Sequence, residues 1–130
     1  MAKAGLLLVL ILVVSLAACG GESAPAGSAG TADAAAGEKV FAEVSAPACS
    51  SCHSLEPDVT LVGPSLAKVG AQAGARVSGE SAEDYLRKAV VEPNAFVVEG
   101  FTSNLMPGTY ATQLSEQQID DLVAYMLTLK

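Results

Sequence analysis

Cys49-Ser50-Ser51-Cys52-His53 is the stretch around which the rest of this chain is organised. Two thiols three positions apart, followed at once by an imidazole, stand together on one short turn. A structural zinc site needs four ligands, and His53 is the only histidine of the chain. A thioredoxin-like redox pair would lie beside alternating strands and helices, and no such alternation appears nearby. Both of these interpretations are therefore weak.

The pattern C-x-x-C-H is the attachment signature for c-type haem. Cys49 and Cys52 are each expected to form a thioether with one haem vinyl group. His53 is then expected to bind the iron as the proximal ligand. The spacing is needed because one turn has to present two sulfurs to one porphyrin edge and an imidazole to its face. The predicted cofactor is one covalently attached haem c.

The first residues have the composition of an export signal. Met1-Ala2-Lys3 is a short basic start, and residues 6–16 are nearly unbroken aliphatic sequence. This run is short for a membrane span and has signal-peptide proportions. It ends in small residues before Cys19, as in a bacterial lipobox, whose cysteine is acylated and becomes the mature N-terminus. We expect a signal peptide over 1–18 and lipidation at Cys19; an ordinary secretory signal or an uncleaved anchor is the alternative.

The cysteine count and the charge agree with this division. Of three cysteines, one is assigned to lipid and two to haem, which leaves none for a disulfide. Without Lys3, the predicted mature chain keeps 6 basic residues against 14 acidic ones, a formal charge of −8. Nucleic acid is excluded as a partner because phosphate binding needs clustered Lys and Arg. The acidic balance favours redox partners with a basic patch, or partners that dock mostly through apolar surface.

The rest of the chain predicts a tether followed by one helical domain. Residues 19–32 are rich in Gly, Ala and Ser, which is typical of a flexible linker. Residues 33–130 are expected to form an all-α domain of about four helices around the haem. Apolar periodicity and capping residues place these helices near 33–44, 63–70 and 81–92, and from Ser115 onward. The segment 94–114 is expected to be an irregular loop whose apolar residues lie on the haem.

One histidine leaves the sixth iron position to a methionine, to water or to nothing. Met106 lies in the long loop, 53 residues after His53, and Pro107 stiffens the backbone beside it. Met126 lies on the inner face of the last helix, where it is expected to fill the core. A thioether favours ferrous iron and raises the reduction potential. Met106 is therefore predicted as the second axial ligand, with a merely buried side chain as the alternative.

Five patterns follow one another along the domain. They are Gly37-x-x-x-Phe41, Cys49-x-x-Cys52-His53, Gly63-Pro64-x-Leu66, Met106-Pro107, and a final helix with Leu122-Val123-x-Tyr125. In this order they resemble the class I monohaem cytochromes c, here in a bacterial lipoprotein form. The likeness extends to small bacterial cytochromes c and to the cytochrome c modules of some terminal oxidases.

The resemblance implies several contacts. The first and last helices are expected to cross at Gly37 and Tyr125. The Pro64 carbonyl is expected to accept a hydrogen bond from the far nitrogen of His53 and so to fix its orientation. Asn104 or Tyr110 is expected to reach the Met106 sulfur or a haem propionate.

The leading functional expectation is a membrane-anchored one-electron carrier, which is not an enzyme. It would be exported and lipid-anchored on the extracytoplasmic (periplasmic) face of a bacterial membrane, as a monomer. Its partners would be respiratory or photosynthetic redox proteins, such as a quinol-oxidising complex and a terminal oxidase or reaction centre. A fixed haem subunit of a larger respiratory complex is the first alternative. An open-site haem enzyme or gas sensor is the second.

Overall fold

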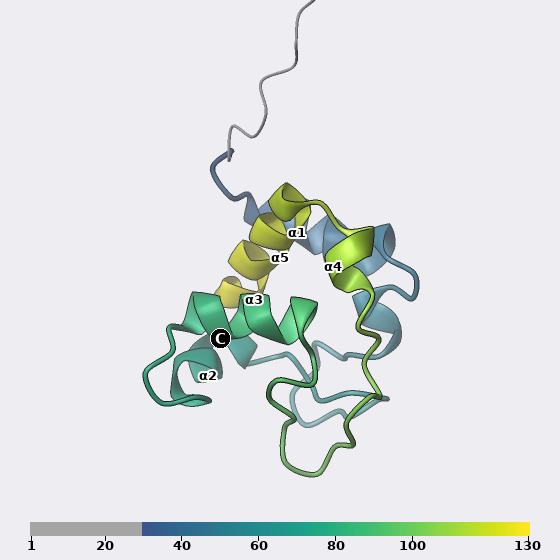
Figure 1. Ribbon diagram of the computed structural model, residues 1–130, viewed down its shortest axis with the longest axis vertical. Helices are drawn as coiled ribbons and strands as arrows, with labels where there is room; N and C mark the ends of the chain where they lie inside the picture. The colour runs from purple at the N-terminus through teal and green to yellow at the C-terminus, as the bar shows by residue number, and fades with distance from the viewer. Residues whose placement is uncertain (1–29) are drawn as a thin grey trace, which may run out of the picture.

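The computed structural model describes residues 30–130, and within them every regular element is helical and no strand is present. The predicted signal peptide, Cys19 and most of the tether lie outside the described residues. The elements in chain order are α1 (Ala34–Lys39), the π-helical turn η1 (Val40–Val44), the 3₁₀ turn η2 (Cys49–Ser51), α2 (Val69–Gln72), the 3₁₀ turn η3 (Ala73–Ala75), α3 (Ala82–Val91), α4 (Tyr110–Gln113) and α5 (Glu116–Thr128) (Figure 1). The all-α expectation is confirmed.

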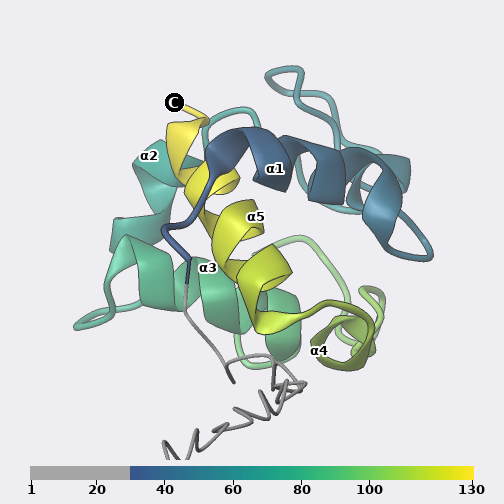
Figure 2. The ribbon, with the colours of Figure 1, turned by 90° about the horizontal axis from the view of Figure 1, so that it is seen from above.

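The helices α1 and α5 cross each other at very short range (Figure 2). Gly37 stands at the crossing, where an added Cβ would lie 1.9 Å from the Asp121 carbonyl oxygen and 2.8 Å from Tyr125 Cβ. Only a residue without a side chain allows two backbones to approach this closely. One turn further on, the rings of Phe41 and Tyr125 pack with their centroids 5.8 Å apart. The crossing implied at Gly37 and Tyr125 is confirmed.

Three helices begin where their capping residues predicted. The side chain of Asp33 accepts hydrogen bonds from two amides in the first turn of α1. Ser81 accepts from the Asp84 amide, and Ser115 and Gln118 form a reciprocal capping box at the start of α5. These side chains satisfy amide groups that have no partner inside the helix. The predicted starts at Asp33, Ser81 and Ser115 are therefore confirmed.

Two other expectations about the elements are wrong. Residues 64–68 are not helical, and α2 begins only at Val69, with Gly70 inside it rather than at its end. Gly70 is there because the backbone passes close to α5: an added Cβ would lie 2.5 Å from the Met126 carbonyl oxygen. The segment 94–114 is irregular only as far as Thr109, since it ends in the short helix α4.

The core lies where α1, α3 and α5 meet. Leu86 from α3 and Ile119 and Leu122 from α5 are each 1 % exposed. Met126 is also buried in this cluster, as expected for a methionine that fills the core. Among residues 30–130, no helix has both the length and the apolar character that a membrane crossing requires. Helices form one side of the core, and two long loops lie along its opposite side.

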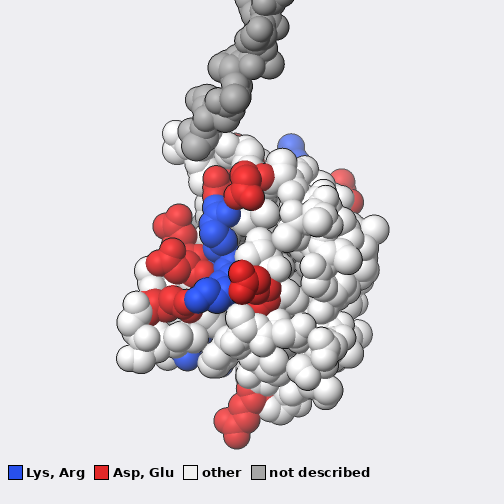
Figure 3. Space-filling model, in the orientation of Figure 1, with Lys and Arg blue, Asp and Glu red and all other residues white. Residues whose placement is uncertain are grey.

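Charged side chains gather over α3 and the neighbouring start of α5 (Figure 3). There Arg87 pairs with Glu116 and Asp120, and Lys88 pairs with Glu80. Exposed pairs of this kind contribute little stability, typically below about 1 kcal/mol each. The loops that extend from this flank in the same view are almost free of charge.

Candidate functional site

A large apolar hollow opens between α3 and two long loops, one that follows His53 and one that leads to Met106. Its empty space, open mouth included, is about 1260 Å³. Leu86, Val90 and Phe101 contribute to its walls, and Cys49, Cys52, His53 and Met106 all line it. The structure therefore brings the four predicted attachment and ligand residues to one place, although they come from two distant parts of the chain.

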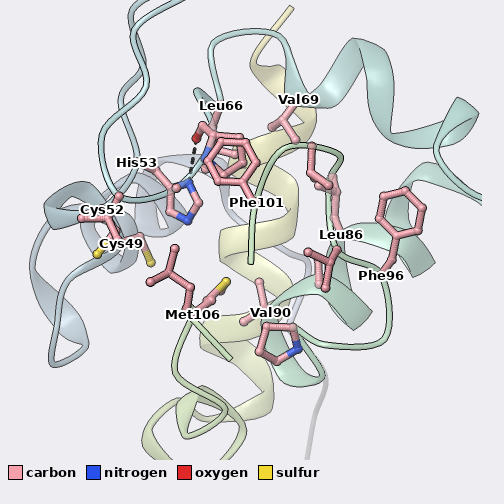
Figure 4. A pocket seen from close by; sticks show the side chains of 18 of the residues that line it. Cys49, Cys52, His53, Leu66, Val69, Leu86, Val90, Phe96, Phe101 and Met106 are labelled. Carbon is pink, nitrogen blue, oxygen red and sulfur yellow. Dashed lines mark hydrogen bonds between the residues drawn. The ribbon is translucent and has the colours of Figure 1, made fainter. Parts of the chain in front are cut away.

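The side chains of His53 and Met106 point into the same space, and the sulfurs of Cys49 and Cys52 lie beside it (Figure 4). Both thiols are free, and all four side chains are half-buried. Met106 also packs against the hydrophobic core, which holds its loop in place. An imidazole and a thioether thus enter one cavity from separate segments, with two thiols at its edge.

The turn that carries the two thiols is built by its own backbone. The amides of Cys52 and His53 both donate to the Cys49 carbonyl, at 3.1 and 2.9 Å. This folds residues 49–53 into the 3₁₀ turn η2 and the two residues after it. Because the turn is so tight, both sulfurs and the imidazole are presented from one short piece of chain.

The orientation of His53 is set by the segment Gly63-Pro64. Its Nδ1 lies 2.8 Å from the Pro64 carbonyl oxygen. A carbonyl can only accept, so Nδ1 carries the proton and Nε2 keeps a free lone pair. An added Cβ on Gly63 would lie 2.5 Å from Cε1 of the ring. The implied contact with Pro64 is present, and it engages a carbonyl that a helix starting at this segment would use within its own first turn.

The comparison with known proteins agrees with this geometry. The family described as Cytochrome c matches residues 34–130. The chain belongs to the cytochrome c family. Membership implies electron transfer through haem, and the spacing of Cys49 and Cys52 is consistent with covalent haem c. The comparison with curated proteins found no match for the chain.

Asn104 and Tyr110 have other partners in this cytochrome c domain than the expected ones. The backbone amide of Asn104 donates to Asn94 Oδ1 at 2.6 Å, and its side-chain oxygen accepts from Asn94 at 3.1 Å. The Tyr110 hydroxyl donates to the Pro47 carbonyl at 3.0 Å. Within the described residues, no hydrogen bond reaches the Met106 sulfur. The two side chains therefore brace the loops around the hollow, and their contact with a propionate remains a prediction.

Arg76 is a site residue that the sequence did not reveal. It lines the hollow and is the only Lys or Arg among the described residues that do so. Its Nη2 donates to Gln72 Oε1 at 2.6 Å, one helical turn earlier. In the sequence it stands alone in what reads as a polar loop, because the helix from Val69 onward is not apparent. No motif around Arg76 in the sequence marks it as a site residue.

Burial shapes the acid–base behaviour of the site. It raises the pKa of the Cys49 thiol, because a thiolate is poorly solvated there, while the hydrogen bond with Ser45 acts in the opposite direction. Burial also raises the pKa of Tyr110, and the nearby sulfurs of Cys49 and Cys52 add to this. Tyr110 therefore keeps the proton that it donates to Pro47.

The residues of this cytochrome c domain fit a c-type haem. Two free thiols stand one turn apart, His53 offers Nε2, and Met106 offers a soft thioether. The walls are apolar, as a porphyrin requires, and Arg76 supplies one cation for an acidic substituent. Each chemical demand of the group thus has a matching residue at the hollow.

Proposed function

We propose that this chain is a membrane-anchored one-electron carrier. Haem would be bound covalently to Cys49 and Cys52, with His53 and Met106 as axial ligands. The observation that carries the proposal is the convergence of these four side chains on one apolar hollow (Figure 4). When bound, haem supplies a single reversible one-electron couple at its iron.

Hydrogen bonds around the hollow support such a role because they hold the candidate ligands in place. Pro64 holds His53 in one orientation, so Nε2 does not have to move between oxidation states. Two hydrogen bonds between Asn94 and Asn104 tie together the ends of residues 94–104, just before Met106. The walls of the hollow are mostly apolar, which disfavours water beside the ligands. An electron can therefore pass without any bond being made or broken in the protein.

Visible spectra of the purified protein, oxidised and reduced, test this function. We expect a low-spin c-type spectrum in both states that carbon monoxide does not change. A shift on adding carbon monoxide to the reduced protein would contradict the closed site and favour an open-site enzyme or gas sensor. Sedimentation of the extracted protein as a monomer would favour a mobile carrier over a fixed subunit.

The membrane anchor is tested by Cys19→Ser. If Cys19 is acylated, the variant is expected to move from the membrane fraction to the soluble fraction, because the acyl chains supply the stable anchoring. The measurement is the haem absorbance in each fraction after cell lysis. The haem spectrum itself should be unchanged, which serves as the internal control. A variant that stayed with the membrane although its signal peptide had been cleaved would contradict lipid anchoring at this residue.

Arg76→Gln is expected to lower the reduction potential by tens of millivolts. Removing a positive charge beside the haem stabilises the ferric state, whose iron carries one more positive charge. The measurement is a potentiometric titration of the visible spectrum. The matched control is Arg87→Gln, which removes a charge that is already paired with Glu116 and Asp120 on the surface. Equal changes in reduction potential in the two variants would show that Arg76 affects the haem no more than a paired surface charge does.

A further inference from the structure

The two loops that bound the hollow carry no positive charge. Residues 40–67 and 93–115 contain Glu43, Glu56, Asp58 and Glu99 but neither Lys nor Arg. Every Lys and Arg of the described chain lies elsewhere: Lys39, Lys68, Arg76, Arg87, Lys88 and Lys130. Figure 3 shows the same division on one face, with the mixed charges over α3 and an almost uncharged surface beside them. These two segments therefore bring acidic but no basic side chains to the surroundings of the hollow, and Arg76, the one described Lys or Arg that lines it, lies outside both of them.

Large apolar side chains are exposed on the loop after His53. Leu55, Val59 and Leu61 are 39 %, 42 % and 50 % exposed. None of the three lines the hollow, so a group bound there would leave them in water. Val62 and Leu105 are exposed too, and these two line the hollow from its two loops. We call the set Leu55, Val59, Leu61, Val62 and Leu105 the mouth surface.

The loop that carries most of the mouth surface is fixed by hydrogen bonds. The Leu66 amide donates to the Ser54 carbonyl at 2.8 Å, and the Gly63 amide donates to the Cys52 carbonyl at 2.9 Å. Between them, the Ser65 hydroxyl donates to the Glu56 carbonyl at 2.7 Å. The same backbone holds His53 through Pro64. The two exposed leucines and two exposed valines of this loop are thus presented in one arrangement next to the redox site.

We infer that the mouth surface docks an electron-transfer protein whose contact patch is apolar at its centre and rimmed by Lys or Arg. This rests on the proposed function, because it places the partner against the edge of the haem. The apolar side chains supply contact area, and Glu56 and Asp58 between them select a basic rim. If a second copy of this chain docked here, the acidic side chains of the two copies would face and repel each other. Neither described loop has a basic residue that could compensate for this repulsion. An anionic lipid surface would be repelled in the same way.

Binding is tested with redox-inert probes rather than with an unidentified partner. Tris(phenanthroline)chromium(III) is a paramagnetic cation with apolar faces, and hexaamminechromium(III) has the same charge without them. Each is titrated into the reduced full-length holoprotein while amide signals are followed by NMR. The first complex is expected to broaden the signals of residues 54–63 and of Leu105. The second is expected to broaden mainly the acidic flank on α3, around Glu83 and Asp84.

Matched variants identify the residues that bind. Leu61→Ser is expected to weaken binding of the phenanthroline complex about threefold to fivefold, as the loss of a half-exposed leucine contact implies. Leu61→Met should restore it. Glu56→Gln is expected to weaken binding about twofold or more at low ionic strength, whereas Glu83→Gln on α3 should not. Both glutamates are exposed, so the pair differs in place rather than in chemistry.

Several outcomes would overturn the inference. One is that both complexes broaden the same signals; another is that Leu61→Ser leaves binding unchanged. A dimer in sedimentation, or binding to uncharged lipid vesicles, that Leu61→Ser abolishes would assign the surface to another occupant. These outcomes leave the electron carrier intact. A protein without bound haem would instead overturn the proposed function, and the visible spectrum shows this before any titration.

Discussion

The double variant Cys49→Ala, Cys52→Ala is expected to lose cooperative thermal unfolding. Without the thioethers haem is no longer retained, and the apolar hollow that it would fill is left to water. A small domain is stable by only about 5–15 kcal/mol, so losing its largest apolar contact removes most of that margin. The measurement is the thermal transition followed by far-UV circular dichroism, which we expect to be broad or absent.

The control for this variant is Cys19→Ser, which removes a thiol that lies outside the described residues. Its domain should unfold cooperatively with haem bound. A sharp transition in the double variant, at a temperature near that of the parent protein, would show that the helices around α1 and α5 form a stable core by themselves.

Replacing Met106 by alanine is expected to open the iron on one side. The reduced variant should bind carbon monoxide, and its oxidised spectrum should change to a high-spin form. The reduction potential should fall by on the order of 0.1 V or more, because a thioether favours ferrous iron and axial ligands set the potential over a wide range. Visible spectra with and without carbon monoxide, and a potentiometric titration, measure these effects.

Met126→Leu is the matched control, because Met126 is the other methionine of the domain and lies buried in the core. It should keep a spectrum that carbon monoxide does not change, with some loss of stability. If Met106→Ala kept the low-spin spectrum, another residue would occupy the sixth position, and the proposed axial pair would be wrong.

The helices that the sequence predicts well are those with strong local signals. Asp33, Ser81 and Ser115 cap their helices through short-range hydrogen bonds, and these can be read from neighbouring residues. The helix expected over 63–70 failed for the opposite reason. Pro64 has the local signals of a first helical position, but its carbonyl is taken by His53, eleven positions away in sequence. A long-range contact overrode the local preference.

The site shows the same contrast. Cys49, Cys52 and His53 form a five-residue motif, and the loop context singles out Met106. The roles expected of Asn104 and Tyr110 depended on which way their polar groups point, and the structure gives these groups to Asn94 and Pro47. Arg76 was missed because only the folded chain shows that a residue at the end of a short helical segment faces the hollow.

The family, the all-α class, the attachment motif and the starts of three helices can all be predicted from the order of residues along the chain. Each of these depends on residues within a few positions of one another, or on the order of such motifs along the chain. The directions of the Arg76, Asn104 and Tyr110 side chains become visible only in the folded chain. The same holds for the exposure of Leu55, Val59 and Leu61 beside the hollow. Those outcomes depend on which distant segments pack together, and hydrophobic and hydrogen-bond contacts between such segments leave no local pattern.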